Sequence, residues 1–152
     1  MFESLKSIAS NNSTTLFTNS PATGVNLVGI GEYLIHYQKL IDTKAHILEN
    51  EKPYSYHGKA FTIDDNLAAI GSFNWDMRSV YIDTELMLVV EGKDFYKKVE
   101  KELNFYQKDA SKVLEDGSKE NLSGKEISEI NFLKKLGSLI FVIIFYPFRF
   151  LF

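Results

Sequence analysis

The sequence predicts an α/β fold, in which a mixed β-sheet is flanked by helices and followed by a hydrophobic C-terminal helix. Short runs of strand-forming residues alternate with helical patterns through residues 1–114, which is the order expected of such a sheet. The chain has 152 residues, 45% of them hydrophobic, and can bury a core. Residues 115–130 form a polar linker, and residues 131–152 a hydrophobic segment.

The first part of the chain is expected to form a helix, a strand, a second helix and a second strand. Residues 2–9 indicate the first helix and residues 14–18 the first strand. A loop with proline and glycine at 19–29 leads to a helix at 30–43, and residues 45–49 form the second strand. One apolar stripe defines the second helix: Ile30, Tyr33, Leu34, Tyr37, Leu40 and Ile41.

A β-hairpin is expected next. Residues 57–63 and 67–74 are rich in strand formers and small apolar residues, and Asp64, Asp65 and Asn66 form a polar turn between them. A strand at 83–90 and an amphipathic helix at 93–114 complete the domain. We therefore expect the hairpin to belong to the sheet of the α/β unit.

The hairpin gathers side chains that suit a phosphodiester. Because side chains alternate along a strand, His57 and Lys59 share a face, as do Ser72 and Asn74. Lys59 supplies positive charge, and Ser72 and Asn74 supply hydrogen-bond donors to phosphate oxygens. His57 can attack phosphorus as a neutral imidazole and form a phosphohistidine. Glu85 is the candidate acceptor for a hydrogen bond from the His57 ring nitrogen that does not attack phosphorus. This chemistry requires no metal or cofactor.

These residues form an extended pattern, His57-x-Lys59-x4-Asp64-x6-Gly71-Ser72-x-Asn74, followed by D-x-R-S and T-E-L. The pattern resembles the H-x-K signature of the phospholipase D superfamily, and its surroundings resemble the C-terminal half of bacterial cardiolipin synthases and similar phosphatidyltransferases. The resemblance covers roughly residues 14–110. It implies the phosphohistidine mechanism and the same role for Glu85.

Other residues of the motif are expected to be structural. Asp64 is an odd number of residues from His57, which turns it to the opposite face at the hairpin tip. Gly71 belongs to the same structural set, and Asp76 and Arg78 are expected to form an ion pair. Trp75 either lines the mouth of the pocket or is a buried anchor.

The printed sequence has one H-x-K motif, whereas members of this superfamily use two. His36 and His46 do not rebuild the pattern, because Gln38 and Leu48 stand where lysine is required. The second site is therefore expected from an identical chain paired around a two-fold axis, or from a missing half of a longer protein. The second alternative is favoured, because the 56 residues before His57 leave little room for outer strands.

The sequence predicts an enzyme that transfers or hydrolyses phospholipid phosphodiesters. The net charge of −3 disfavours nucleic acid as a partner and hence the alternative of a nuclease-like homodimer. A catalytically incomplete module that binds anionic lipid is the other alternative. Residues 136–148 are almost wholly apolar but too short to span a bilayer, so we expect a membrane-surface helix and association with the bacterial cytoplasmic membrane.

Overall fold

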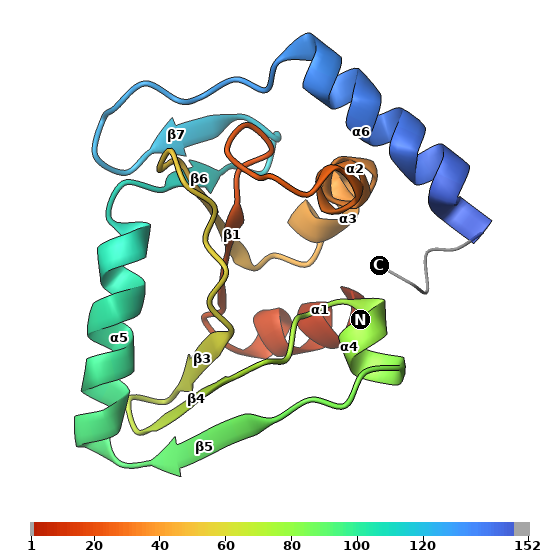
Figure 1. The fold of residues 1–152 in the computed structure, drawn as a ribbon. Helices are drawn as coiled ribbons and strands as arrows, with labels where there is room; N and C mark the ends of the chain where they lie inside the picture. Colours follow the sequence, from red (N-terminus) through yellow and green to blue (C-terminus); the bar gives the residue numbers. More distant parts are fainter. Residues whose placement is uncertain (1, 148–152) are drawn as a thin grey trace. The chain divides into compact units, whose positions relative to one another are not determined.

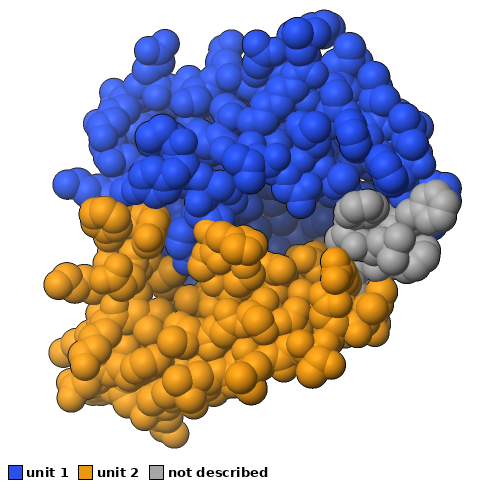
Figure 2. Space-filling model, viewed as in Figure 1, with its two compact units in different colours: residues 1–56, 107–149 blue, residues 57–106, 150–152 orange. Residues whose placement is uncertain are grey.

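The computed structural model describes residues 2–147, which form two compact units (Figures 1 and 2). Unit 1 comprises residues 2–56 and 107–147, and unit 2 comprises residues 57–106. Sheets flanked by helices confirm the α/β fold class. The expectation of one sheet was wrong, since the predicted hairpin belongs to a separate sheet in unit 2.

Unit 1 is built on a four-stranded mixed sheet of order β1-β2-β6-β7. Strands β1 and β2 are parallel, and the other neighbours are antiparallel. Its core contains Leu5, Leu40, Ile41, Ile47 and Val113. The elements are α1 (Phe2–Asn11), β1 (Thr15–Asn19), α2 (Leu27–Ile35), α3 (Tyr37–Ile41), β2 (His46–Asn50), β6 (Ser111–Val113), β7 (Lys119–Asn121) and α6 (Phe132–Phe145).

Two helices replace the single helix expected at 30–43. Helix α2 begins earlier than expected because the Asn26 side chain accepts hydrogen bonds from the backbone of Val28 (3.0 Å) and Gly29 (3.2 Å). Such an N-cap satisfies amides that have no partner in the first turn. The chain then bends at His36, whose φ of −99° and ψ of 7° are not helical.

The region after α5 also differs from the prediction. Helix α5 (Lys93–Gln107) ends before residue 114, and the backbone of Ser111 pairs with Glu49 of β2. Residues 119–121, expected in a linker, form β7, which pairs with β6. Gly117 adopts a φ of +81° in the connecting turn, a conformation that glycine adopts without strain. Pairing with β2 therefore overrides the helical pattern.

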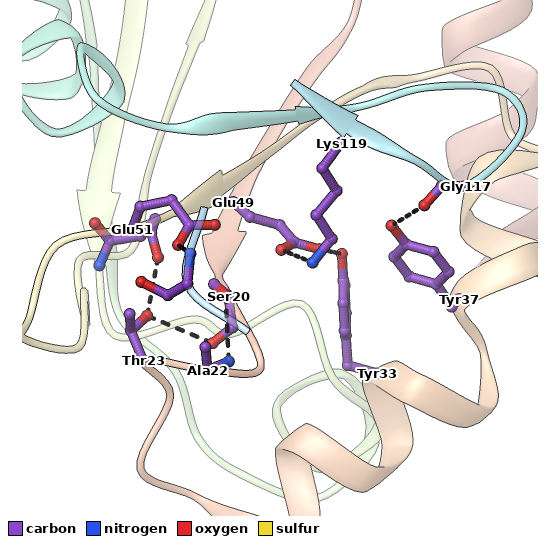
Figure 3. Close-up of polar contacts among 11 residues, drawn as sticks. Ser20, Ala22, Thr23, Tyr33, Tyr37, Glu49, Glu51, Gly117 and Lys119 are labelled. Carbon is purple, nitrogen blue, oxygen red and sulfur yellow. Dashed lines mark hydrogen bonds and ion pairs between the residues drawn. The ribbon is translucent and has the colours of Figure 1, made fainter. Parts of the chain in front are cut away.

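A buried carboxylate links this hairpin to α2 (Figure 3). Glu49 is fully buried, its Oε1 accepts a hydrogen bond from the Tyr33 hydroxyl at 2.7 Å, and its Oε2 lies 2.5 Å from Lys119 Nζ. Burial, followed by the Glu49 charge, raises the pKa of Tyr33 far above its usual value. The Tyr37 hydroxyl donates to the Gly117 carbonyl at 3.2 Å. Lys119, expected in a polar linker, is thus the charge partner of the buried Glu49 carboxylate.

Helix α6 packs on α2 within unit 1 (Figure 1). It covers residues 132–145 of the predicted hydrophobic segment, and residues 148–152 of that segment lie outside the described residues. None of the helices within residues 2–147 combines the length and apolar character needed to cross a membrane.

Unit 2 contains a three-stranded antiparallel sheet of order β3-β4-β5 and two helices. Asp64 and Asp65 have φ values of 50° and 55°, which bring the chain round between β3 and β4. The strands are shorter than expected, so His57 precedes β3 and Glu85 precedes β5. The elements are β3 (Ala60–Ile63), β4 (Leu67–Gly71), α4 (Met77–Tyr81), β5 (Met87–Glu91) and α5.

Candidate active site

His57 and Lys59 lie against each other just before β3. Lys59 Nζ is 2.7 Å from His57 Nε2 and 3.1 Å from the His57 backbone oxygen. His57 is exposed and Lys59 is half-buried. When Lys59 is an ammonium it can only donate, so Nε2 is the acceptor and the ring proton of a neutral His57 is on Nδ1.

Ser72 and Glu85 form a second contact at the other end of the motif. The Ser72 hydroxyl donates to the Glu85 carboxylate and accepts from the Leu86 amide at 3.0 Å. Hydrogen bonds from Ser72 and then Ser79 hold the pKa of Glu85 below its ordinary value, and the charges of Lys59 and Arg78 lower it further. The carboxylate expected to orient His57 is therefore engaged with Ser72.

Gly71 sets how closely β4 and β5 approach. A Cβ at this position would lie 2.1 Å from the Leu86 carbonyl oxygen and 2.4 Å from Met87 Sδ. The Gly71 amide donates to the Lys59 carbonyl at 3.0 Å, which ties the lysine of the motif to β4. Glycine is required here because no larger residue fits between β4 and the chain that leads into β5.

An open pocket of about 670 Å³ lies within unit 2 and includes both His57 and Lys59. Ile70, Leu86 and Leu88 contribute apolar side chains to its lining. Ile70 and Leu88 are directly paired across β4 and β5 and therefore share a face of the sheet. Ser72, Asn74 and Glu85, which the sequence placed with His57 and Lys59, are not among the residues that line this pocket.

The loop after β4 holds the remaining residues of the motif. The Asn74 backbone amide donates to Ser79 Oγ at 3.3 Å, and the Asp76 side chain caps α4 by accepting from the Ser79 backbone amide at 2.8 Å. Arg78 forms an ion pair with Asp83, with Nε 2.9 Å from Oδ2, rather than the predicted pair with Asp76.

Trp75 and Asp64 are both at the surface. Trp75 is 49% exposed, which excludes the buried anchor that the sequence left open. Asp64 lies in the turn at the hairpin tip, and its neighbour Asp65 accepts from the Tyr96 hydroxyl at 2.9 Å.

Sequence reasoning missed two parts of the site. One is Ser79, which is buried and contacts the loop at Asn74 and Asp76. The D-x-x-S spacing at the start of α4 is an N-cap signal that could have identified it. The other is the apolar wall of the pocket, formed by Leu88 on β5, Ile70 facing it on β4, and Leu86 just before β5.

The family model described as "Cardiolipin synthase, PLD-like domain" matches residues 16–106, which contain the whole H-x-K pattern and the pocket. The chain belongs to this family. The predicted membership of the phospholipase D superfamily is therefore confirmed.

Relatives of this PLD-like domain support the assignment. The chain is 40% identical over 58 residues to cardiolipin synthase A of Wigglesworthia glossinidia brevipalpis, a match that covers 38% of this chain and 12% of that protein. It is 39% identical over 57 residues to cardiolipin synthase C of Escherichia coli (strain K12), again 38% of this chain and 12% of the relative. A match of 48% over 46 residues to an uncharacterized protein of Helicobacter pylori (strain ATCC 700392 / 26695) covers 30% of this chain and 9% of that protein.

The chain thus spans a small part of these curated relatives, 9% to 12% of their length. No solved structure matches the chain.

Proposed function

We propose that this PLD-like domain provides one catalytic half of a phosphatidyltransferase or phosphodiesterase that acts on phospholipids. One observation carries the proposal: the Lys59 ammonium lies 2.7 Å from the His57 imidazole in a pocket that also contains apolar side chains. A cation beside a nucleophile suits a phosphate, and the apolar wall suits the lipid part of the same substrate. The cardiolipin synthases among the relatives support this substrate class.

In this proposal His57 is the nucleophile. When a phosphodiester enters the pocket, Lys59 exchanges the ring nitrogen for a non-bridging oxygen, which frees the Nε2 lone pair. Nε2 then bonds to phosphorus, and the bond from phosphorus to the leaving alcohol oxygen breaks. A second histidine, supplied by the partner half, protonates the leaving oxygen. An acceptor alcohol or water then attacks phosphorus and gives its proton to the second histidine, and the bond from phosphorus to Nε2 breaks, which restores the ring.

Ser72, Asn74 and Glu85 complete the proposed machinery. We propose that substrate draws the Ser72 hydroxyl away from Glu85 and toward a phosphate oxygen, where the Asn74 amide also donates. Glu85 is then available to accept from Nδ1–H of His57, the role that the motif implies. The Ser72–Glu85 contact of the structure is the resting arrangement from which this exchange starts.

The partner half is part of the proposal. One H-x-K motif supplies one histidine, and the chemistry requires a nucleophile and an acid. The second histidine comes from an identical chain or from another half of a longer protein. A phospholipid substrate places the enzyme at a membrane, which we propose is the bacterial cytoplasmic membrane.

The test is covalent labelling with a phosphatidyl ester of p-nitrophenol that carries radioactive phosphate. Because p-nitrophenolate leaves without a proton, labelling requires His57 but no second histidine. We expect acid-labile label on the wild-type chain and none on His57→Ala. His46→Ala is the matched control, because His46 is also exposed but lies in unit 1, and it should retain the label.

Two results would decide against this function. Label that persists in His57→Ala places the nucleophile elsewhere. Absence of label in the wild type, together with retained binding of anionic lipid, identifies the catalytically incomplete lipid-binding module. A nuclease-like activity is disfavoured by the apolar side of the pocket and by the net charge of −3.

A further inference from the structure

Helix α6 uses one narrow face to contact the protein. Ser138 is fully buried and Val142 is 3% exposed, and both lie against α2. The contact is close: a Cβ on Gly31 of α2 would lie 2.4 Å from both the Ser138 backbone oxygen and Val142 Cγ2. Lys134 also points to the protein and donates to the Ala22 carbonyl at 2.6 Å. The position of α6 on unit 1 therefore fixes which side chains face outward.

The outward face of α6 is apolar throughout. On a surface helix the polar residues normally face water, whereas here Lys134 and Ser138 face the protein. The outward side chains are between 44% and 73% exposed, and a continuous apolar stripe of this kind indicates a binding surface. We call it the α6 stripe; it consists of Phe132, Leu133, Leu136, Ile140, Ile143 and Ile144.

The chemistry around the α6 stripe fits an anionic lipid surface. Lys135 is exposed on α6, and its ammonium can reach headgroups while the stripe contacts acyl chains. Residues 132–147 contain two lysines and no acidic residue, so an anionic surface is not repelled. At 14 residues the helix is about 21 Å long, shorter than the hydrocarbon core of a bilayer.

We infer that α6 is a membrane-surface helix that lies flat on anionic phospholipid with the α6 stripe inserted. This inference rests on the proposed function, because a phospholipid substrate has to be reached at the membrane. Helix α6 lies beyond residues 16–106, the part that matches the family. The exposed apolar stripe, the exposed Lys135 on the same helix and the lack of acidic residues at 132–147 match acyl chains beneath anionic headgroups, so lipid is the occupant favoured over a second protein chain.

The test is co-sedimentation of the full chain with vesicles of phosphatidylcholine containing phosphatidylglycerol. Ile143→Asp and Leu133→Asp place an acid in the stripe at positions that are 71% and 73% exposed, so the fold is preserved. Each should weaken vesicle binding by about tenfold or more. Val25→Asp, at an apolar position of unit 1 that is 79% exposed, is the matched control and should bind as the wild type.

Lipid composition gives a second readout. Lys135→Gln should lower binding to vesicles with phosphatidylglycerol by about fivefold, the effect of one lysine near an anionic surface, and leave binding to pure phosphatidylcholine unchanged. His46→Ala, the control of the labelling experiment, should bind vesicles as the wild type. Failure of the labelling experiment with normal vesicle binding would thus reject the proposed chemistry and not the role of α6.

Two outcomes would overturn the inference. One is vesicle binding that the stripe variants do not change. The other is loss of a dimer in sedimentation velocity for Ile143→Asp without loss of vesicle binding, which would assign the α6 stripe to a contact between protein chains.

Discussion

The ammonium beside His57 determines what the imidazole can do before substrate arrives. Lys59 Nζ lies 2.7 Å from Nε2 and occupies its lone pair, the one with which we propose that the ring attacks phosphorus. A phosphate oxygen is a better partner for the ammonium than a neutral ring nitrogen, because it carries charge. Substrate binding and uncovering of the nucleophile are therefore one event in the proposed mechanism.

The contact between Ser72 and Glu85 predicts a pH dependence of stability. The folded pKa of Glu85 is lowered, chiefly by the hydrogen bond from Ser72, so the ionised form is favoured in the folded state. The ionised Glu85 carboxylate therefore stabilises the folded state above the ordinary pKa of 4.5, and this stabilisation is lost as the pH falls through the lower pKa of the folded state. Glu85→Gln should therefore lower the melting temperature at pH 7, and the difference from wild type should vanish in acid. An unchanged difference at low pH would contradict this origin.

The buried pair of Glu49 and Lys119 predicts a larger loss of stability. Lys119→Met leaves the fully buried carboxylate with the Tyr33 hydroxyl but without its cation, which should lower the free energy of unfolding by about 3 kcal/mol. Urea denaturation measures the change. Lys125→Met is the control, because its ion pair with Asp109 is exposed on the lysine side and should contribute less than about 1 kcal/mol. Equal losses would contradict the importance of burial.

At the scale of elements, the contact between α2 and α6 depends on a glycine. Gly31→Ala places a Cβ 2.4 Å from Ser138 and Val142, so α6 has to move away, at a cost of about 1–3 kcal/mol. Gly29→Ala on the same helix meets no atom closer than 3.6 Å and should be neutral or slightly stabilising. Hydrogen exchange of α6 should accelerate in the first variant and not in the second. Equal protection in both would show that α6 does not rest on Gly31.

The sequence predicts most elements because their signals are local. The polar turn at Asp64 and Asp65 and the helix predicted at residues 2–9 are examples. The sequence does not predict β6 and β7, because their strand conformation depends on contacts with β2, which is distant in the sequence. Ser111 pairs with the backbone of Glu49, and Lys119 forms an ion pair with its side chain. The start of α2 at Leu27 was missed although Asn26 is a standard N-cap residue. Tertiary pairing, which local patterns do not contain, accounts for the largest differences.

One of the two close side-chain contacts in the candidate site was predicted from the sequence and the other was not. The contact between His57 and Lys59 follows from their spacing of two residues, although both precede β3 and do not lie on it. The contact between Ser72 and Glu85 was not predicted, because it joins residues 13 apart through the pairing of β4 and β5. The pair at a spacing of two, His57 and Lys59, was therefore found, whereas the pair brought together by strand register, Ser72 and Glu85, was not.

At the scale of the whole molecule, the residues proposed for catalysis and those proposed for membrane binding belong to different units. Unit 2 contains the pocket with His57 and Lys59, and unit 1 contains α6 with its apolar stripe. The family match ends at residue 106 and therefore includes the pocket but not α6. When the labelled ester is dispersed in detergent, so that no membrane has to be reached, the stripe variants should label as the wild type. Each experiment then serves as a control for the other.

The proposed need for two histidines predicts how mixed assemblies behave. If two identical chains form the site, each site requires His57 from both, so turnover of phosphatidylglycerol by an equimolar mixture of wild type and His57→Ala should be about a quarter of wild type. Independent sites would give about half, and mixtures with His46→Ala should keep full activity. If a different half supplies the second histidine, the chain alone should turn over little substrate and gain activity when that half is added. Full turnover by a chain that sedimentation shows to be a monomer would contradict both forms of the proposal, because one histidine would then serve as nucleophile and acid.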